Sequence, residues 1–313
     1  MLITLDIEDE KPLLIVLAGP TAVGKTKLSI ELAKKNNSSI FSCDSRQFYR
    51  ELSIGTAKPS INELNQIPHY FINNKSIDQS YSAGDYEKEI ISKLDGFFLK
   101  QKIAFLVGGS GMYIDAVCKG LDNLPKDLSV RNRLNSELQE NGIEYLQESL
   151  KNLDPLHYKN IDLNNSQRLI RALEVCIVAS KPYSSLLTSK KKIRSFKIVK
   201  FLLHINKNLL ELNIENRVNE MVKYGLFEEV ESLRKKEGLN ALNTVGYKEI
   251  FNFYNGETTK EEAINLIKKN TKKYAKRQMT WFKKDLSYQW IDNTDNLESF
   301  KEINGIITKL KPK

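Results

Sequence analysis

The residues best suited to chemistry lie in GPTAVGKT, residues 19–26. This segment fits G-x-x-x-x-G-K-[ST], a pattern typical of a phosphate-binding loop between a strand and a helix. Gly19 and Gly24 let backbone N–H groups turn toward an anion, and the N-terminus of the next helix adds partial positive charge. Lys25 is expected to reach phosphate oxygens and Thr26 to ligate Mg²⁺, unless the segment is a chance glycine turn. The predicted diphosphate- or nucleotide-binding residues are Gly19, Pro20, Thr21, Ala22, Val23, Gly24, Lys25 and Thr26.

The aspartate that usually ends an apolar strand and helps such a loop to hold Mg²⁺ is not at the expected place. The strand expected over residues 103–107 is followed instead by Gly-Gly-Ser-Gly at 108–111. These glycines allow close approach to a ligand and Ser110 offers a hydroxyl, although a tight turn would also need glycine. Asp44 is the acid that ends an early strand. A different use of the loop is therefore considered, in which it holds a diphosphate as a leaving group.

Asp44 opens a polar segment at the carboxyl end of a predicted strand. In a parallel sheet that end faces the crevice where ligands bind. Ser45, Arg46, Gln47 and Tyr49 add hydrogen-bond donors, acceptors and an aromatic face, a set that can hold the edge of a base. The alternative is that Asp44 caps a helix. The nearby phosphate loop favours a functional role.

A second candidate region is basic and aromatic. Residues 268–284 contain eight Lys or Arg and no Asp or Glu, with Tyr274, Trp281 and Phe282 among them. Basic side chains contact phosphates and aromatic rings stack on unpaired bases, so the segment favours RNA contact. The alternative is a solvated basic helix face whose aromatics point into the core. Earlier in the chain, Gln167, Arg168 and Arg171 share one face of a predicted helix, as phosphate ligands or as ordinary surface charge.

An α/β framework must position these segments. Residues 13–18, 39–43 and 103–107 are expected to form short buried strands, and residues 25–35 and 86–98 to form helices. Strands that alternate with helices in this way predict a parallel sheet. The fold class is therefore α/β, with a P-loop core.

The pattern changes after residue 121. Residues 128–192 are mostly helical in pattern, and a strand pattern returns at 201–205. We therefore expect a P-loop α/β core, residues 1–120 plus 198–313, interrupted by a helical insertion domain at 121–197. The remaining expected helices are 166–179 in the insertion, and 209–223, 227–235 and a basic 261–284 in the core.

Composition limits the function classes. The 313 residues are 41% hydrophobic and 28% charged, which excludes overall disorder, and the net charge of +9 favours a polyanionic partner, although an AT-rich coding bias could also inflate lysine. Three cysteines and three histidines are dispersed, so neither a disulfide framework nor a metal cluster is indicated. MLITLDIEDE at the N-terminus is not a signal peptide, and no apolar stretch is long enough to span a membrane. A cytoplasmic monomer is expected, without membrane association or an obligate protein partner.

Eight segments together match one known family, in that family's order and over nearly the whole chain. They are GPTAVGKT at 19–26, DSRQFY at 44–49, IGTAKP at 54–59, YSAGDY at 81–86, LVGGSGMY at 106–113, QRLIRALEV at 167–175, VGYKE at 245–249 and YAKRQMTWF at 274–282. On these motifs the chain resembles the bacterial tRNA dimethylallyltransferases, also called tRNA isopentenyltransferases.

The resemblance implies transfer of a dimethylallyl group from dimethylallyl diphosphate, with Mg²⁺. The acceptor would be N6 of the adenosine immediately 3′ of the anticodon, in tRNAs reading codons that begin with U. The implied partners are the tRNA anticodon stem-loop and dimethylallyl diphosphate. The implied fold is a P-loop α/β core with a helical insertion domain.

The resemblance also assigns roles to matching positions. Asp44 would be the general base, Ser110 would hydrogen-bond the diphosphate near the scissile bond, and Lys25 would neutralise its charge. The positions implied to contact tRNA are Asp44, Ser45, Arg46, Gln47, Ser110, Arg131, Gln167, Arg168, Leu169, Ile170, Arg171, Val245, Gly246, Tyr247, Lys248, Lys276, Arg277, Gln278, Met279, Thr280, Trp281, Phe282 and Lys283.

Two positions depart from the family pattern. Ser110 stands where the family usually has Thr, and Asn73 stands where it usually has Asp. The C-terminal zinc finger of the eukaryotic relatives is absent from the sequence. Three other functions stay open: an adenylate (cytokinin-type) dimethylallyltransferase, a P-loop small-molecule kinase, and a non-catalytic RNA-binding protein.

Overall fold

A computed structural model describes residues 11–188 and 191–311. The N-terminal segment judged for a targeting signal, residues 1–10, lies outside this range. The chain divides into two compact units, Met1–Cys118 with Ile193–Lys313, and Lys119–Lys192. The second unit ends before the boundary expected at residue 197, because Lys197 is the first residue of a strand in the first unit. Within the described ranges, no helix is both long and apolar enough to span a membrane.

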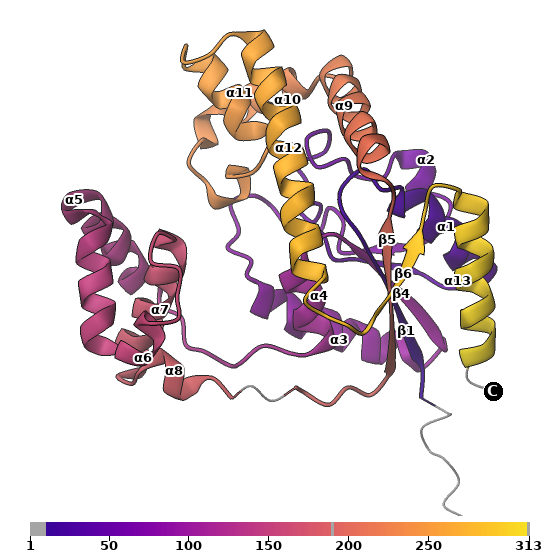
Figure 1. The fold of residues 1–313 in the computed structure, drawn as a ribbon, viewed down its shortest axis with the longest axis horizontal. Coiled ribbons are helices and arrows are strands. Elements are labelled where there is room, and N and C mark those ends of the chain that lie inside the picture. Colours follow the sequence, from indigo (N-terminus) through magenta and orange to yellow (C-terminus); the bar gives the residue numbers. More distant parts are fainter. Residues whose placement is uncertain (1–10, 189–190, 312–313) are drawn as a thin grey trace, which may run out of the picture. The chain divides into compact units, whose positions relative to one another are not determined.

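The first unit is built on a six-stranded parallel sheet (Figure 1). Its strands lie in the order β3-β2-β4-β1-β5-β6, so β1 is central, and β4 is inserted between β1 and β2 after the chain has formed the edge strand β3. The strands are β1 (Leu13–Ala18), β2 (Ile40–Ser42), β3 (His69–Tyr70), β4 (Ile103–Gly108), β5 (Lys197–His204) and β6 (Tyr288–Asp292). All six residues of β1 and of β4 are buried, as expected for continuous apolar strands with helices on both faces.

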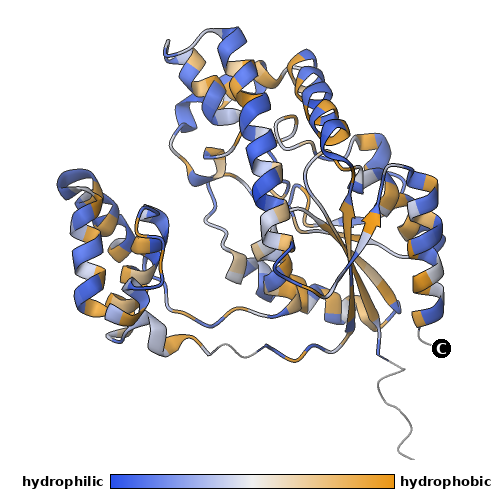
Figure 2. Cartoon of the chain, viewed as in Figure 1, coloured by the Kyte–Doolittle hydropathy of each residue, from blue (hydrophilic) through white to orange (hydrophobic). Residues whose placement is uncertain are grey.

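Helices close both faces of this sheet. Alternate residues of β1 and β4, such as Leu13, Ile15 and Phe105, form one core with Leu28 of α1 (Lys25–Lys35) and Ile303 of α13 (Asn296–Leu310). On the other face, α3 (Ala83–Phe98) packs against β4 and against α4 (Gly111–Cys118). The strands are coloured as hydrophobic and the outer helix faces as hydrophilic in Figure 2.

The remaining helices of the first unit follow β5. They are α9 (Lys207–Lys223), α10 (Leu226–Ser232), α11 (Tyr247–Tyr254) and α12 (Lys260–Phe282), with two 3₁₀ turns, η2 (Arg234–Lys236) and η3 (Asn240–Leu242); a short α2 (Ile61–Leu64) follows β2. The long helix α12 begins with a capping box, in which the side chains and backbone N–H groups of Thr259 and Glu262 bond reciprocally. It packs against α9 and α11, and at its C-terminal end against α4.

The second unit is helical. It contains α5 (Leu128–Leu153), α6 (Pro155–Tyr158), α7 (Ser166–Ala179) and α8 (Tyr183–Leu186). Gly142, at φ 80, kinks α5 into two segments, a backbone conformation that glycine adopts without steric cost. Leu134, Leu146 and Leu150 of α5 form its core with Leu169 and Leu173 of α7.

The expected strands and helices named above are present, and their ends are shifted by at most four residues. The predicted elements did not include β3, β6, α2, α4, α11 or α13. Strand β3 has two residues, and β6 is an edge strand in which only Tyr288 and Ile291 are buried, so neither has the continuous apolar run of a central strand.

Candidate active site

Parallel pairing brings the three predicted loops to one edge of the sheet. Ala18 at the end of β1 lies opposite Gly108 at the end of β4, and Ser42 at the end of β2 lies opposite Val107. Neighbouring strands are about 4.8 Å apart. The phosphate loop, Asp44 and Ser110 therefore leave the sheet side by side, although up to 90 residues separate them in sequence.

The phosphate loop has the backbone that its glycines predict. A Cβ on Gly19 would lie 2.9 Å from the carbonyl oxygen of Leu203, so the loop passes too close to β5 for any other residue. Gly24 has φ +95 and precedes α1, which has no side-chain cap and no acidic residue in its first turn. The first N–H groups of α1 are thus suited to bind an anion.

Lys25 folds back over this loop. Its Nζ donates to the carbonyl oxygens of Gly19 at 2.9 Å and Pro20 at 2.7 Å. Burial, together with the nearby charge of Arg217, lowers the pKa of Lys25 to about 8, and Asp44 partly opposes this shift. The ammonium is therefore costly to keep charged until an anion arrives.

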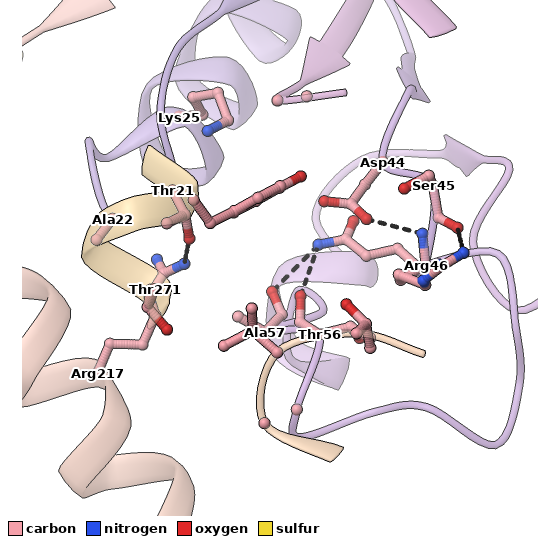
Figure 3. Close-up of a pocket in the computed structure, with 18 of the residues that line it drawn as sticks. Thr21, Ala22, Lys25, Asp44, Ser45, Arg46, Thr56, Ala57, Arg217 and Thr271 are labelled. Atoms are coloured by element: carbon pink, nitrogen blue, oxygen red, sulfur yellow. Dashed lines mark hydrogen bonds between the residues drawn. The ribbon is translucent and has the colours of Figure 1, made fainter. Parts of the chain in front are cut away.

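Arg217 is a site residue that the sequence pattern did not reveal. It comes from α9, where its Nη1 donates to Thr21 Oγ1 at 3.2 Å, and it lines the same cavity as Lys25. Figure 3 shows the guanidinium directed at the phosphate loop. No motif marks one arginine on a charged helix, so only the packing of α9 beside the loop could identify it.

Asp44 lies on the other side of the cavity. Its Oδ1 accepts a hydrogen bond from the backbone N–H of Arg46 at 2.9 Å, and the segment forms a turn rather than a helix. The helix-cap alternative is therefore wrong, because this bond closes a local turn of the Asx type. Figure 3 shows the carboxylate directed into the cavity that Lys25 enters from the opposite wall.

Ser110 belongs to a short hydrogen-bonded chain. Its hydroxyl oxygen accepts from the backbone N–H of Ser45 at 3.0 Å, and its side chain also hydrogen-bonds the phenol of Tyr274. Tyr274 comes from α12, lines the cavity and carries the guanidinium of Arg277 over its ring at 5.7 Å. Burial and the negative charge of Asp44 raise the pKa of Tyr274 to about 12, so the phenol stays neutral.

The IGTAKP segment forms a third wall of the cavity. Gln47 Nε2 donates to the carbonyl oxygens of Thr56 at 3.2 Å and Ala57 at 3.3 Å. On its outer side, the Glu229 carboxylate accepts from the backbone N–H groups of Ser53, Ile54 and Gly55 at 2.7–3.0 Å. This wall is thus held from both sides.

Asn73 retains an acceptor at the position where the resemblance led us to expect Asp. Its Oδ1 accepts from Lys58 Nζ at 2.6 Å, and Lys58 also bonds the carbonyl oxygen of Tyr49. Burial lowers the pKa of Lys58 to about 8. A neutral amide oxygen is sufficient for this structural bond.

These walls enclose a cavity of about 570 Å³, within the size range of small-molecule sites. Thr26 and Asp44 offer oxygen atoms to it. No group of three or more His, Cys, Asp or Glu side chains is arranged to hold a metal among the described residues. A small number of oxygen ligands from the protein is compatible with Mg²⁺, because this ion usually binds one or two protein groups together with phosphate oxygens and water.

Several residues implied to contact tRNA have buried side chains, and their RNA contacts stay a prediction. Phe282 is 1% exposed and packs against Tyr288. Tyr247, Leu169 and Ile170 are equally buried and pack within their own units, and Gln278 is bonded inside the first unit. Even a strongly basic helix needs one apolar face that packs into the core. For the segment at residues 268–284, the alternative of a basic helix with its aromatic side chains in the core therefore holds for Phe282.

Other members of the set are exposed. On α12 these are Lys276, Arg277 and Thr280, with Lys283 directly after it, while Trp281 is 41% exposed and donates to Asp115 Oδ2 at 2.9 Å. Lys248 is exposed at the rim of the cavity, where Val245 and Gly246 also lie, and Met279 is half-buried. Ser45, Arg46 and Gln47 line the cavity itself.

In the second unit, two arginines share one carboxylate. Glu174 is 1% exposed and accepts from Arg131 Nη2 at 2.6 Å and Arg171 Nη1 at 2.8 Å. Burial opposes the charge on Glu174, but these hydrogen bonds outweigh it and lower its pKa. Gln167 and Arg168 are exposed on the same helix.

The fold and the site define a P-loop α/β protein in which a carboxylate faces the phosphate loop across one cavity. A sequence profile of the family described as IPP transferase matches residues 47–285. The chain is 49% identical to a tRNA dimethylallyltransferase of Christiangramia forsetii, over 90% of this chain and 94% of that protein. It is 47% identical to one of Flavobacterium johnsoniae, over 95% and 98%. This chain belongs to the IPP transferase family.

Solved structures agree. The full-length tRNA isopentenylpyrophosphate transferase of Bacillus halodurans is 34% identical, with a TM-score of 0.71 over 96% of this chain and 97% of that one. A eukaryotic dimethylallyltransferase acting on tRNA is 26% identical, with a TM-score of 0.77 over 95% of this chain and 80% of that one.

Proposed function

We propose that this protein transfers a dimethylallyl group from dimethylallyl diphosphate to N6 of an adenosine in tRNA, releasing diphosphate. The adenosine is the one immediately 3′ of the anticodon, in tRNAs reading codons that begin with U. Family membership supports the reaction class. The observation that carries the proposal is that Lys25 and Asp44 enter one cavity from opposite walls.

Departure of the diphosphate is assisted by positive charge. The allylic C–O bond breaks as N6 attacks the same carbon, and negative charge grows on the bridging oxygen. Lys25, Arg217 and the N-terminus of α1 surround the place where the diphosphate binds, and they stabilise that charge. Ser110 follows β4 on the neighbouring loop, and its hydroxyl would exchange its bond to Tyr274 for a bond to the leaving oxygen.

The nucleophile needs a base. The N6 lone pair is delocalised into the adenine ring, so attack must be accompanied by loss of an N6 proton. Asp44 accepts that proton, since its carboxylate faces the cavity and its orientation is held by Arg46 N–H. Gln47 and Tyr274 supply the polar and aromatic surface against which the base lies.

Thr26, with the diphosphate oxygens, would hold Mg²⁺. The ion would supply further neutralisation of the leaving group. Asp44 would be a second oxygen ligand from the cavity wall, and its two oxygens allow one to remain turned toward N6.

RNA binding follows from the exposed cations. Lys276 and Arg277 on α12 and Lys283 directly after it, with Lys248 at the cavity rim, contact phosphates of the anticodon stem-loop. In the insertion unit, Glu174 holds Arg131 and Arg171 in fixed positions, and with exposed Arg168 they form a second contact. The adenosine leaves its stack to enter the cavity, which costs least in an unpaired loop. The three cysteines are buried thiols, which fits the reducing cytoplasm, where tRNA is modified.

A transfer assay tests the proposal. Protein and Mg²⁺ are mixed with labelled dimethylallyl diphosphate and an unmodified anticodon stem-loop, and in parallel with AMP. We expect label on the stem-loop, and a fall of about 10²–10⁴-fold in kcat for Asp44→Asn, which keeps the shape but not the base. Glu228→Gln, on the exposed surface of α10, is the matched control and should leave the rate unchanged.

Other outcomes would redirect the assignment. Label on AMP alone would indicate an adenylate dimethylallyltransferase, and phosphate transfer from ATP would indicate a kinase. Label in neither tube, with full-length tRNA also unmodified, would reject the transferase and leave an RNA-binding protein.

A further inference from the structure

The side chain of Gln278 is built into the donor site rather than into an RNA surface. It is 7% exposed. Its Oε1 accepts from the backbone N–H of Thr21 at 2.9 Å, and its Nε2 donates to the carbonyl oxygen of Gly109 at 2.9 Å. One amide therefore bridges the phosphate loop and the loop that carries Ser110, from a helix more than 160 residues further along the chain.

The opposing backbone is shaped to admit this amide. A Cβ on Gly109 would lie 2.1 Å from Gln278 Nε2, which no rearrangement short of moving the amide would relieve. Gly109 does not have a positive φ, so its role is space rather than conformation. One turn further along α12, Trp281 fits against Gly111 in the same way, with 2.3 Å to a Cβ, and bonds Asp115.

Gln278 and Trp281 thus fasten the same face of α12 to both ends of the Ser110 loop. The phosphate loop would hold the diphosphate, whereas Ser110 would act at the bond that breaks. The distance between those two loops must match one bound molecule. Small errors in such spacing cost large factors in rate, since the reacting atoms must be held within fractions of an ångström.

We propose that Gln278 is a positioning residue for the donor: it ties the phosphate loop to the Ser110 loop and sets the spacing at which they grip the diphosphate. This inference rests on the proposed function for its donor. It replaces the RNA contact that the family resemblance implied for this residue. The exposed Lys276 lies two residues before it on α12, and Arg277, also exposed, lies over Tyr274 and lines the same cavity, so the RNA role passes to these exposed cations.

Gln278→Met tests this role, because methionine keeps the length and volume of glutamine but bonds neither loop. Gln289→Met, on the exposed side of β6, is the matched control. Affinity for inorganic diphosphate with Mg²⁺, measured with and without the stem-loop, and kcat/KM for dimethylallyl diphosphate should each fall about 10–100-fold. Affinity for the stem-loop should change less than twofold, and the control should match wild type.

A second variant covers the case in which Gln278→Met does not fold. Gly109→Ala places a Cβ where the amide lies, while its backbone conformation suits alanine. This variant should lower the affinity for diphosphate and kcat/KM for dimethylallyl diphosphate as Gln278→Met does, and should leave the affinity for the stem-loop unchanged. Loss of stem-loop affinity with unchanged donor parameters in Gln278→Met would overturn the inference and restore the RNA contact. Unchanged diphosphate affinity in both variants would overturn it as well.

The two proposals can fail separately. If wild-type protein binds diphosphate but labels neither RNA nor AMP, the proposed transfer reaction is wrong. The effect of Gln278→Met on diphosphate affinity then still decides whether this residue sets the loop spacing.

Discussion

At the scale of single residues, the site is organised around opposite charges that are kept apart until a ligand arrives. Lys25 donates to two carbonyl oxygens of its own loop, and its charge is disfavoured by burial and by Arg217. A bound diphosphate would reverse that balance, because it supplies negative charge to both cations. Near pH 8, where part of the Lys25 population is neutral, binding of the donor should therefore be accompanied by uptake of a proton at Lys25.

Donor affinity should fall as the pH rises through 8. With a pKa of about 8, Lys25 is about nine-tenths protonated at pH 7 and about one-tenth protonated at pH 9. Only the protonated form binds the anion well, so the Kd for dimethylallyl diphosphate should rise about tenfold between these values. Titration calorimetry across this range measures it.

Lys25→Arg is the control for that pH dependence. Arginine stays charged throughout the range, so its affinity should be lower overall but flat. A wild-type affinity that is equally flat from pH 7 to pH 9 would show that Lys25 is not the group that binds the donor.

At the scale of elements, one carboxylate fastens the IGTAKP segment to the helices beside it. Glu229 of α10 accepts three backbone N–H groups from residues 53–55 and also the hydroxyl of Tyr247 at 2.6 Å. Gly55 is required at this contact, since a Cβ would lie 2.5 Å from the Tyr247 ring. Tyr247 is thus a structural part of the cavity wall.

Glu229→Ala should loosen this wall. The three amides and one hydroxyl would lose a charged acceptor, and hydrogen bonds to charged groups contribute about 1.5–3 kcal/mol each before exposure to water reduces that. Because the site is partly exposed, we expect a total loss of about 1–3 kcal/mol in the free energy of unfolding. Amide hydrogen exchange should accelerate at Ser53, Ile54 and Gly55.

The neighbouring Glu228→Ala is the control, because Glu228 is exposed on the same helix. It should change neither the melting temperature nor the exchange rates. Equal effects of the two variants would mean that the bonds to residues 53–55 do not hold the wall.

At the scale of the whole molecule, charge and division into units determine how a large polyanion is bound. The net charge of +9 is carried in part by exposed cations on α12 and on the insertion unit. Each phosphate contact releases counterions, so stem-loop affinity should fall steeply and linearly on a log–log plot against salt. Within each unit, by contrast, buried side chains such as Leu169 and Phe282 stabilise the fold.

Arg168→Ala should lower the salt slope for stem-loop binding by about 0.7–1, the contribution of one phosphate contact. Lys309→Ala, on the exposed side of α13, removes the same charge and should leave the slope unchanged. Binding curves at several salt concentrations give both values. Identical slopes for the two variants would remove Arg168 from the RNA interface.

Much of the site can be predicted from the sequence because its central parts lie at strand ends. Once residues 13–18, 39–43 and 103–107 are recognised as parallel strands, the loops after them share one sheet edge, and Lys25, Asp44 and Ser110 must be neighbours. The phosphate loop can also be predicted from the sequence, because its backbone conformation depends on glycines within the loop itself.

The helical contributions required the tertiary structure. Helices α9 and α12 contribute Arg217, Tyr274 and Gln278 to the site. Gln278 accepts a hydrogen bond from the N–H of Thr21, which lies 257 positions earlier in the sequence. In a helix, every third or fourth residue shares a face, so a basic, aromatic sequence is compatible with several rotations about its axis. Packing against α4, α9 and the Ser110 loop selects one rotation, and that choice places Gln278 inside and Lys276 outside.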